Sequence, residues 1–244
     1  MPKFSVVIPA AGKAERFGGE KKTFAKLDGR PIFLRTLEHF MNRPDVCQTI
    51  LGVAPEDVGE MKTKYGPNLG FMGVQLVEGG ARRCDTVAAA LKVVSADAEY
   101  VAIHDAARPC VTTDMIDGVF AEAVKSGAAI LAAPVVGTLK RVAAGSHAVE
   151  QTLDRAGIYE AQTPQVFRKD ILAAAYARIA EFADDVTDDA QVVERHGHAV
   201  TIVPSDASNL KITTKGDLTL ANAILKSRPV RSAPRMGAFE EAQW

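Results

Sequence analysis

Short runs of apolar residues recur along the chain and predict buried β-strands. They span residues 3–9, 48–54, 73–77, 99–104, 128–135 and 199–203. These runs are rich in Val, Ile and Ala and are mostly continuous rather than alternating. Continuous apolar runs of this length are typical of strands that are covered on both faces of a sheet.

Between the strands, apolar residues recur at helical spacing. In residues 31–43, Pro31 suits the first turn of a helix, and Phe33, Leu37 and Phe40 fall on one face. Further helices are predicted for residues 55–65, 84–95, 113–126, 168–183, 187–196 and 214–226. The alternation of strands and helices predicts an α/β fold, a Rossmann-like, doubly wound and mostly parallel sheet.

One region breaks this alternation. Residues 138–142 and 148–153 are β-like, and the loop 143–147 between them contains Gly145, so they predict a hairpin. We expect the segment of about residues 136–163 to project as an arm that holds two copies of the chain together; the alternative is a surface hairpin without function. One domain is expected over residues 1–226, with a flexible tail over 227–244.

Composition narrows the classes of partner. The 244-residue chain has a net charge of −1 and no obvious basic stripe, which does not favour nucleic acid. No apolar run approaches the ~20 residues of a membrane-spanning helix. The three cysteines are scattered and form no CxxC pair. With no targeting segment before the first strand, these features predict a protein of a bacterial cytoplasm.

The segment after the first strand, residues 10–22, suits a nucleoside triphosphate. Its small residues come first and its cations follow: Ala10, Ala11 and Gly12, then Lys13, Arg16, Lys21 and Lys22. Small residues let backbone N–H groups approach an anion closely. The segment contains neither the Gly-Lys-Ser/Thr of a Walker A loop nor the Gly-x-Gly-x-x-Gly of dinucleotide-binding proteins. A different class of phosphate chemistry is therefore indicated.

A second candidate element lies at the end of the strand 99–104. Asp105 suits a divalent metal such as Mg²⁺ or a sugar hydroxyl, and Arg108 suits a phosphate through its fork of N–H donors. The alternative is an Asp–Arg pair that only ties the loop. The role of His104 is also open. A histidine at a strand end is more often a hydrogen-bonded core residue than an acid or base.

Two further elements contain glycine or lysine in unusual settings. Gly79 and Gly80 follow a strand and permit close approach to a flat ligand such as a base, while Thr86 could reach a ribose or phosphate. A plain glycine turn before a helix is the alternative. Lys211 stands between apolar residues, which points either to a partner carboxylate or to a phosphate.

An ordered set of motifs gives these elements a common meaning. Along the chain occur Ala-Ala-Gly, Gly-Gly, His-Asp-Ala-Ala-Arg-Pro, Ala-Pro-Val-x-x-Thr-x-Lys-Arg, Thr-Pro-Gln, Thr-Asp-Asp-Ala and Asn-x-Lys-Ile-Thr. Over about residues 4–222 the chain resembles the 2-C-methyl-D-erythritol 4-phosphate cytidylyltransferase family. Three positions depart from the usual family pattern, since Ala81 and Ser208 stand where Asp is frequent and Lys21 stands where Pro is frequent.

The resemblance implies a nucleotidyltransferase fold and a reaction. The phosphate of methylerythritol phosphate would attack the α-phosphorus of CTP in line, with Mg²⁺ present and without a covalent enzyme intermediate. Pyrophosphate would leave, and the product would serve isoprenoid precursor synthesis.

The resemblance also implies roles for individual residues. The catalytic residues would be Arg16, Lys22 and Lys211. The CTP contacts would be Ala10, Ala11, Gly12, Gly80, Ala81, Thr86 and Ala106. The contacts to methylerythritol phosphate would be Asp105, Arg108, Thr138, Arg155 and Thr187, with Arg155 offered from the arm of a partner subunit in a homodimer.

Two other functions remain open at this point. A ribitol 5-phosphate cytidylyltransferase would use the same chemistry on another acceptor, although relatives of that kind often carry Ser-Val in place of Ala106 and Ala107. A non-catalytic CTP-binding paralogue would be expected to lose Arg16, Lys22 or Asp105, all of which are present.

Overall fold

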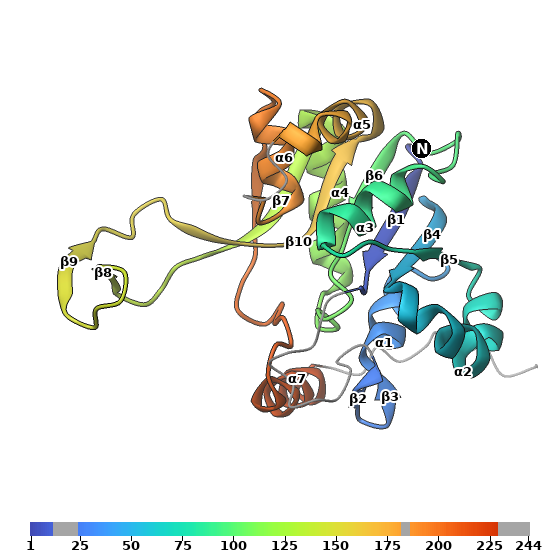
Figure 1. The fold of residues 1–244 in the computed structure, drawn as a ribbon, viewed down its shortest axis with the longest axis horizontal. Helices are drawn as coiled ribbons and strands as arrows, with labels where there is room; N and C mark the ends of the chain where they lie inside the picture. The colour runs from blue at the N-terminus through green and yellow to red at the C-terminus, as the bar shows by residue number, and fades with distance from the viewer. Residues whose placement is uncertain (12–23, 182–185, 229–244) are drawn as a thin grey trace, which may run out of the picture.

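The fold is an α/β sandwich built on one seven-stranded sheet (Figure 1). The computed structural model describes residues 1–11, 24–181 and 186–228. In spatial order the strands are β11 (Thr201–Pro204), β7 (Ala128–Pro134), β10 (Tyr159–Arg168), β6 (Tyr100–Ile103), β1 (Phe4–Pro9), β4 (Val46–Val53) and β5 (Val74–Glu78). The six strands predicted from the sequence are thus confirmed, within one or two residues at their ends.

The pairing is parallel except at β10. Strand β1 pairs in parallel with β4 and β6, β4 with β5, and β7 with β11. Strand β10 runs antiparallel to both β6 and β7. The prediction of a mostly parallel, doubly wound sheet is therefore confirmed, and β10 adds a strand that the sequence pattern did not predict.

Helices cover both faces of the sheet. The described helices are α1 (Ile32–Glu38), α2 (Val58–Phe71) after a 3₁₀ turn Pro55–Asp57, α3 (Arg83–Leu91), α4 (Thr113–Ser126), α5 (Lys169–Ala177), α6 (Asp189–Arg195) and α7 (Lys215–Ser227). The predicted helices 31–43 and 168–183 are longer than what is found, because α1 ends at Glu38 and α5 gives way to a short 3₁₀ turn, Ile179–Glu181.

Successive side chains of a strand point to opposite faces of the sheet, so the apolar residues form two separate cores. Val6 and Ile8 of β1 face a core formed with α1, α2 and α4, whereas Val7 faces the core formed with α3, α5 and α6. Strand β1 is thus covered on both faces, which is why Val6, Val7 and Ile8 are apolar in succession. A third, smaller cluster packs α7 against a short hairpin, β2 (Lys26–Leu27) and β3 (Arg30–Pro31).

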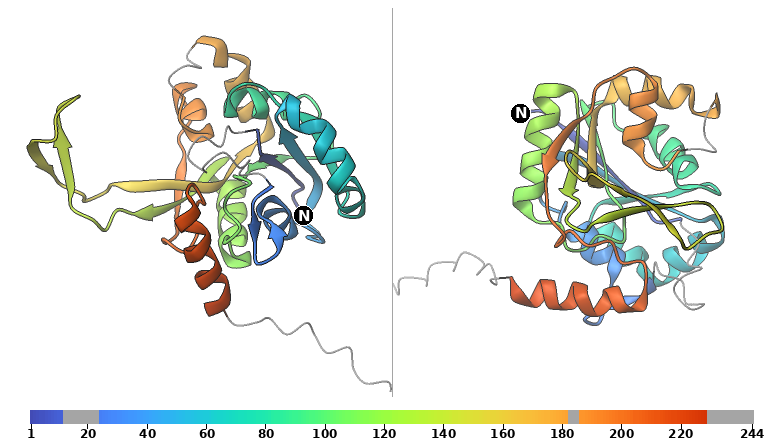
Figure 2. Two further views of the ribbon diagram at one scale, coloured as in Figure 1. Left: turned by 60° about the horizontal axis from the view of Figure 1, so that its bottom comes forward. Right: turned by 90° about the vertical axis from the view of Figure 1, so that its left-hand side faces the viewer.

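The predicted hairpin is present and projects from the body (Figures 1 and 2). It consists of β8 (Leu139–Val142) and β9 (Val149–Leu153), which pair only with each other. The expected arm of residues 136–163 needs one correction at its end. Residues 159–163 belong to β10, because Tyr159–Ala161 pair with β7 in the central sheet.

The end of the described chain is fixed to the fold. Helix α7 runs to Ser227, and the guanidinium of Arg228 donates to the carbonyl of Cys110 at 2.6 Å and to Ser208 Oγ at 3.3 Å. The first two residues of the expected flexible tail are therefore ordered parts of the structure. The rest of that segment, residues 229–244, lies outside the described residues.

Candidate active site

Asp105 stands at the centre of the candidate site. The parallel strand β6 ends at Ile103, and the N–H of His104 still donates to the carbonyl of Val7 in β1, at 2.9 Å. Asp105 therefore emerges at the carboxyl edge of the sheet, next to the end of β1. This edge is where open α/β sheets bind their ligands.

Three cations surround the Asp105 carboxylate. Arg83 Nε lies 3.0 Å from Asp105 Oδ1, while Lys211 Nζ lies 2.7 Å and Arg108 Nε 3.7 Å from Asp105 Oδ2. Burial alone would raise the pKa of Asp105, but the charges of Arg83, Lys211 and Arg108 outweigh it and hold that pKa well below its usual range. Asp105 is a carboxylate at any physiological pH. Because Arg83 also pairs with Asp189, the three cations face two carboxylates, and the cluster has one surplus positive charge.

His104 is a structural member of this region. Thr163 Oγ1 accepts from the N–H of Asp105 at 3.0 Å and lies 3.0 Å from His104 Nδ1, so it donates its single proton to that nitrogen. His104 Nε2 lies 3.1 Å from the carbonyl of Arg108 and must therefore hold the ring proton. Burial lowers the pKa of His104 to about 3. The neutral, fully committed ring cannot act as a base.

Arg108 ties two loops together. Its side chain is buried, and NH1 donates to the carbonyl of Asn209 at 2.7 Å. Asn209 in turn donates to Gln162 Oε1 and to the carbonyl of Thr163, both at 2.9 Å. These bonds fix the loop that presents Lys211. The prediction that Arg108 holds a phosphate stays a prediction, while its loop-tying role is what the contacts describe.

The glycines before α3 permit close packing on Thr86. A Cβ added to Gly79 would lie 2.5 Å from Thr86 Oγ1, and one added to Gly80 would lie 2.4 Å from Asp85 Cβ. The buried Thr86 hydroxyl accepts from the N–H of Gly80 and donates to the carbonyl of Arg82, both at 3.2 Å. Thr86 therefore shapes the Gly79-Gly80-Ala81 loop, and the prediction that Gly80, Ala81 and Thr86 contact CTP stays a prediction.

Two of the predicted CTP contacts lie at the carboxyl edge as well. Ala10 follows β1, and its N–H donates to the carbonyl of Gly52 at 2.6 Å. The carbonyl of Ala106 accepts from Thr36 Oγ1 at 2.9 Å, which fixes the backbone beside Asp105. Ala11 is the last described residue before the gap, so the predicted Gly12, Arg16 and Lys22 lie outside the described residues.

The arm residues do not join the cluster within one chain. Thr138 precedes β8 and Arg155 follows β9, so both lie on the projecting arm (Figure 1). Thr187 lies two residues before α6, where its N–H donates to Gln191 Oε1 at 2.9 Å. The single chain thus brings together Asp105, Arg108 and Lys211 and leaves the arm residues apart.

Several residues of this region were not predicted as site residues. Arg83 reaches Asp105 from the first residue of α3 and lies 2.6 Å from Asp189 through NH1. Thr163 and Gln162 come from β10, the strand that the sequence pattern did not predict. The Arg82-Arg83 pair after a glycine loop was a usable signal, since the first turn of a helix at this edge points toward the ligand site.

The described residues do not fit a metal cage of their own. They contain no group of three or more His, Cys, Asp or Glu side chains that could hold a metal ion. Asp105, the predicted candidate ligand, is already paired with three cations. A divalent cation at this site would therefore depend on the phosphates of the substrate.

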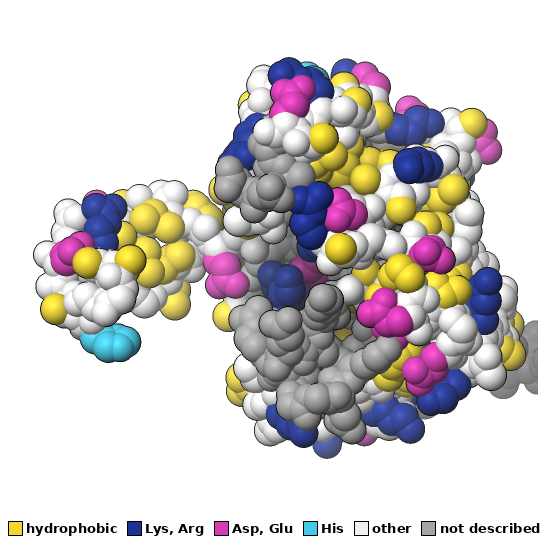
Figure 3. Space-filling model, viewed as in Figure 1, with side chains coloured by type: hydrophobic (Ala, Val, Ile, Leu, Met, Phe, Trp, Pro, Cys, Tyr) yellow, Lys and Arg dark blue, Asp and Glu magenta, His cyan; other side chains and the backbone are white. Residues whose placement is uncertain are grey.

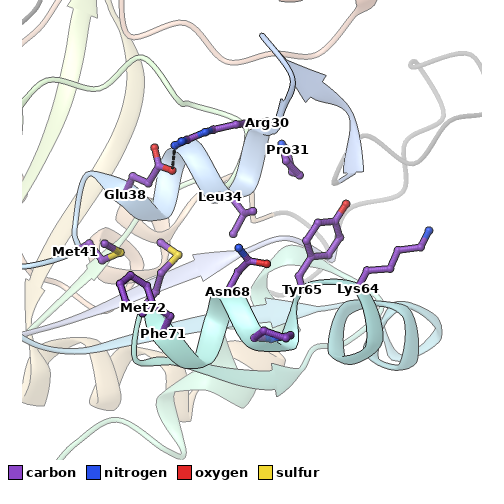
Figure 4. Close-up of a pocket in the computed structure, with 11 residues that line it drawn as sticks. Arg30, Pro31, Leu34, Glu38, Met41, Lys64, Tyr65, Asn68, Phe71 and Met72 are labelled. Carbon is purple, nitrogen blue, oxygen red and sulfur yellow. Dashed lines mark hydrogen bonds and ion pairs between the residues drawn. The ribbon is translucent and has the colours of Figure 1, made fainter.

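A separate groove of about 610 Å³ lies between α1 and α2 (Figure 4). Leu34 and Met41 approach Tyr65 and Met72 across it, and an ion pair of 2.7 Å between Arg30 and Glu38 lies at its border. None of its lining residues belongs to the Asp105 cluster.

Within the described residues, no helix combines the length and the apolar character needed to cross a bilayer.

The mostly parallel sheet with helices on both faces and a charged carboxyl edge is an α/β fold of the nucleotidyltransferase type. A model of the 2-C-methyl-D-erythritol 4-phosphate cytidylyltransferase family matches residues 4–227. The chain belongs to this family and is a cytidylyltransferase enzyme.

Individual relatives agree with the family assignment. A 2-C-methyl-D-erythritol 4-phosphate cytidylyltransferase of Rhodopirellula baltica is 45% identical over 233 residues, covering 91% of this chain and 94% of the relative. One of Solibacter usitatus is 38% identical over 243 residues, covering 94% and 98%.

Solved structures give the same result for the fold. The crystal structure of the Thermus thermophilus 2-C-methyl-D-erythritol 4-phosphate cytidylyltransferase has a TM-score of 0.76 at 32% identity, covering 92% of this chain and 99% of that one. The 4-diphosphocytidyl-2C-methyl-D-erythritol synthase of Anaerococcus prevotii has a TM-score of 0.79 at 28% identity, covering 92% and 96%.

Proposed function

We propose that this enzyme transfers CMP from CTP to 2-C-methyl-D-erythritol 4-phosphate, giving 4-diphosphocytidyl-2-C-methyl-D-erythritol and pyrophosphate for isoprenoid precursor synthesis. The family supports the reaction, and the observation that carries the proposal is the ion cluster at the end of β6. There, Arg83, Lys211 and Arg108 face the carboxylates of Asp105 and Asp189, which leaves one positive charge where two anionic substrates would meet.

In this proposal the chemistry needs charge and position rather than a base. A phosphate oxygen of the acceptor forms a bond to the α-phosphorus of CTP, and the bond from that phosphorus to the bridging oxygen of the β-phosphate breaks. The electron pair leaves with pyrophosphate, and no covalent enzyme intermediate forms. The attacking oxygen is already an anion at neutral pH, which agrees with a His104 that is buried and neutral. Positioning and electrostatic stabilisation then supply the rate.

Each cation has a proposed part. Lys211, with 41% of its side chain exposed, neutralises the acceptor phosphate while Asp105 accepts from the acceptor's hydroxyls. Arg16 and Lys22, which lie outside the described residues, stabilise the charge on the α-phosphate and the departing pyrophosphate. When bound, Mg²⁺ would be held mainly by the CTP phosphates and would lower their negative charge, because Asp105 is already paired with cations.

The arm supports a homodimer in which each subunit completes the site of the other. Apolar side chains gather on the arm (Figure 3), and large ones are exposed there: Val136, Val142, Val149 and Ile158. Exposed apolar side chains in such a group favour an interface. Thr138 and Arg155 would then reach the acceptor phosphate of the partner subunit.

The three cysteines are free, which agrees with the expected reducing cytoplasm of a bacterium.

The reaction is tested by incubating the enzyme, Mg²⁺ and methylerythritol phosphate with CTP, ATP, GTP or UTP and identifying the products by mass spectrometry. The proposal expects the cytidine diphosphate product with CTP alone. Equal turnover of all four nucleotides would contradict it.

A further inference from the structure

A chain of buried contacts runs from α5 to the candidate site. The hydroxyl of Tyr176 in α5 donates to Asp189 Oδ1 at 2.5 Å, and Asp189 Oδ2 lies 2.6 Å from Arg83 NH1. Arg83 Nε in turn donates to Asp105 Oδ1 at 3.0 Å. Four segments are thus linked by three consecutive polar contacts that end on the carboxylate of Asp105.

Asp189 is placed at high cost to stability. Its side chain is 1% exposed, and a buried carboxylate loses its hydration, which a paired charge offsets only in good geometry. Asp189 Oδ2 lies 2.6 Å from Arg83 NH1, and the Asp189 carboxylate helps to raise the pKa of Arg83, so the two form a close ion pair. Apolar side chains would fill this space without that loss of hydration, so packing alone does not account for the carboxylate.

The start of α6 is also pinned from another side. Gln165 of β10 donates to Asp188 Oδ2 at 2.8 Å and accepts from the N–H of Ala190 at 2.9 Å. Burial and the adjacent Asp189 carboxylate raise the pKa of Tyr176, which keeps its hydroxyl a donor. The residue that holds Arg83 therefore has little freedom to move.

The two oxygens of Asp105 are held by different cations. Arg83 holds Oδ1, and Lys211 holds Oδ2. A carboxylate with both oxygens held cannot rotate about its Cβ–Cγ bond. The Arg83 side chain is 28% exposed, so without Asp189 its guanidinium could swing into solvent and release Oδ1.

We infer that Arg83, anchored by Asp189 and Tyr176, is a positioning residue that fixes the Asp105 carboxylate toward the acceptor. This inference rests on the proposed function, because it assigns the acceptor's hydroxyls to Asp105. Losing a hydrogen bond to a charged group corresponds to roughly 10- to 100-fold in affinity. The effect should fall on the acceptor, since Asp105 does not touch CTP in the proposal.

The test compares the variant Tyr176→Phe with the control variant Tyr100→Phe. Tyr100 is a buried tyrosine at the opposite end of β6 and lies outside this chain of contacts. We expect Tyr176→Phe to raise KM for methylerythritol phosphate about 10-fold, with kcat and KM for CTP close to wild type. Tyr100→Phe should leave all three constants unchanged. A wild-type KM for the acceptor in Tyr176→Phe, or a lower kcat and melting temperature at constant KM, would reduce the contacts to a structural role and overturn the inference.

Arg83→Lys separates geometry from charge. Lysine keeps the charge but cannot contact two carboxylates as the guanidinium fork does, so KM for the acceptor should rise in this variant too. A wild-type KM for the acceptor in Arg83→Lys would contradict positioning. Crystal structures of Tyr176→Phe and the wild type test the inference without relying on turnover, because they show whether the Arg83–Asp105 contact changes. If the wild type does not use methylerythritol phosphate, the proposed function fails, while an unchanged Arg83–Asp105 contact in the variant still overturns the positioning.

Discussion

Lys211 Nζ lies 2.7 Å from Asp105 Oδ2, so the loop after β11 and the end of β6 meet in one ion pair. The sequence left two explanations for this lysine, a partner carboxylate or a substrate phosphate. The structure provides the carboxylate, yet the side chain remains 41% exposed. An exposed ammonium can contact both Asp105 and an incoming phosphate, because it has three donors.

This geometry predicts that Lys211→Met lowers kcat/KM for the acceptor by about 10²–10³-fold, since a well-placed cation is removed from the reacting phosphates. The melting temperature should change little, because Arg83 still pairs with the buried Asp105. Steady-state kinetics and thermal unfolding of the same preparation check both statements. A variant with wild-type turnover would remove Lys211 from the site, and unfolding at room temperature would make its role structural.

His104 predicts a specific pH dependence of stability. Its pKa in the fold is about 3, below the ordinary value of 6.5, so the unfolded chain takes up the proton first as pH falls. Stability that His104 contributes is therefore complete above pH 6.5 and is lost between pH 6.5 and 3, at up to about 1.4 kcal/mol per pH unit.

The measurement is the free energy of unfolding in urea between about pH 7.5 and 4.5 for the wild type, His104→Gln and His147→Gln. His147 is an exposed histidine in the turn of the arm and serves as the matched control. His104→Gln should be less stable at neutral pH but should depend less steeply on pH below 6.5. Parallel pH profiles for the wild type and His104→Gln would show that the ring is not held neutral.

The arm predicts complementation between two inactive variants. Lys22→Ala and Arg155→Ala should each lose turnover if both residues serve the reaction. If Arg155 acts in the partner's site, each hybrid dimer contains one site with both residues intact. Random mixing would then restore about a quarter of wild-type activity, because half of the dimers are hybrids. Hybrids that form, as shown by native mass spectrometry, but stay inactive would place Arg155 in the site of its own subunit.

Much of the fold follows from the sequence because continuous apolar runs specify buried parallel strands. Strand β10 was not predicted, since Gln162, Thr163, Pro164 and Gln165 interrupt its apolar pattern. The register of its pairing with β7 shifts between Ala161 and Gln165, where the sheet accommodates the proline. The polar residues that obscure this strand are the ones that bind His104, Asn209 and Asp188.

The site was predictable where one motif contains the chemistry. His104 to Arg108 form such a motif, and the structure places it at the expected sheet edge. Arg83 and Asp189 were not predicted as partners, because their contact depends on how α3 and α6 pack on the same face of the sheet. Pattern and spacing within one segment do not determine such tertiary pairs.

Pyrophosphate release tests most directly whether the enzyme pairs CTP with methylerythritol phosphate. The enzyme is supplied with CTP and Mg²⁺ and with either methylerythritol phosphate or ribitol 5-phosphate. We expect rapid release with methylerythritol phosphate and little with ribitol 5-phosphate. Faster release with ribitol 5-phosphate would contradict the assigned acceptor, and folded enzyme that binds CTP but releases no pyrophosphate with either acceptor would contradict the proposed reaction itself.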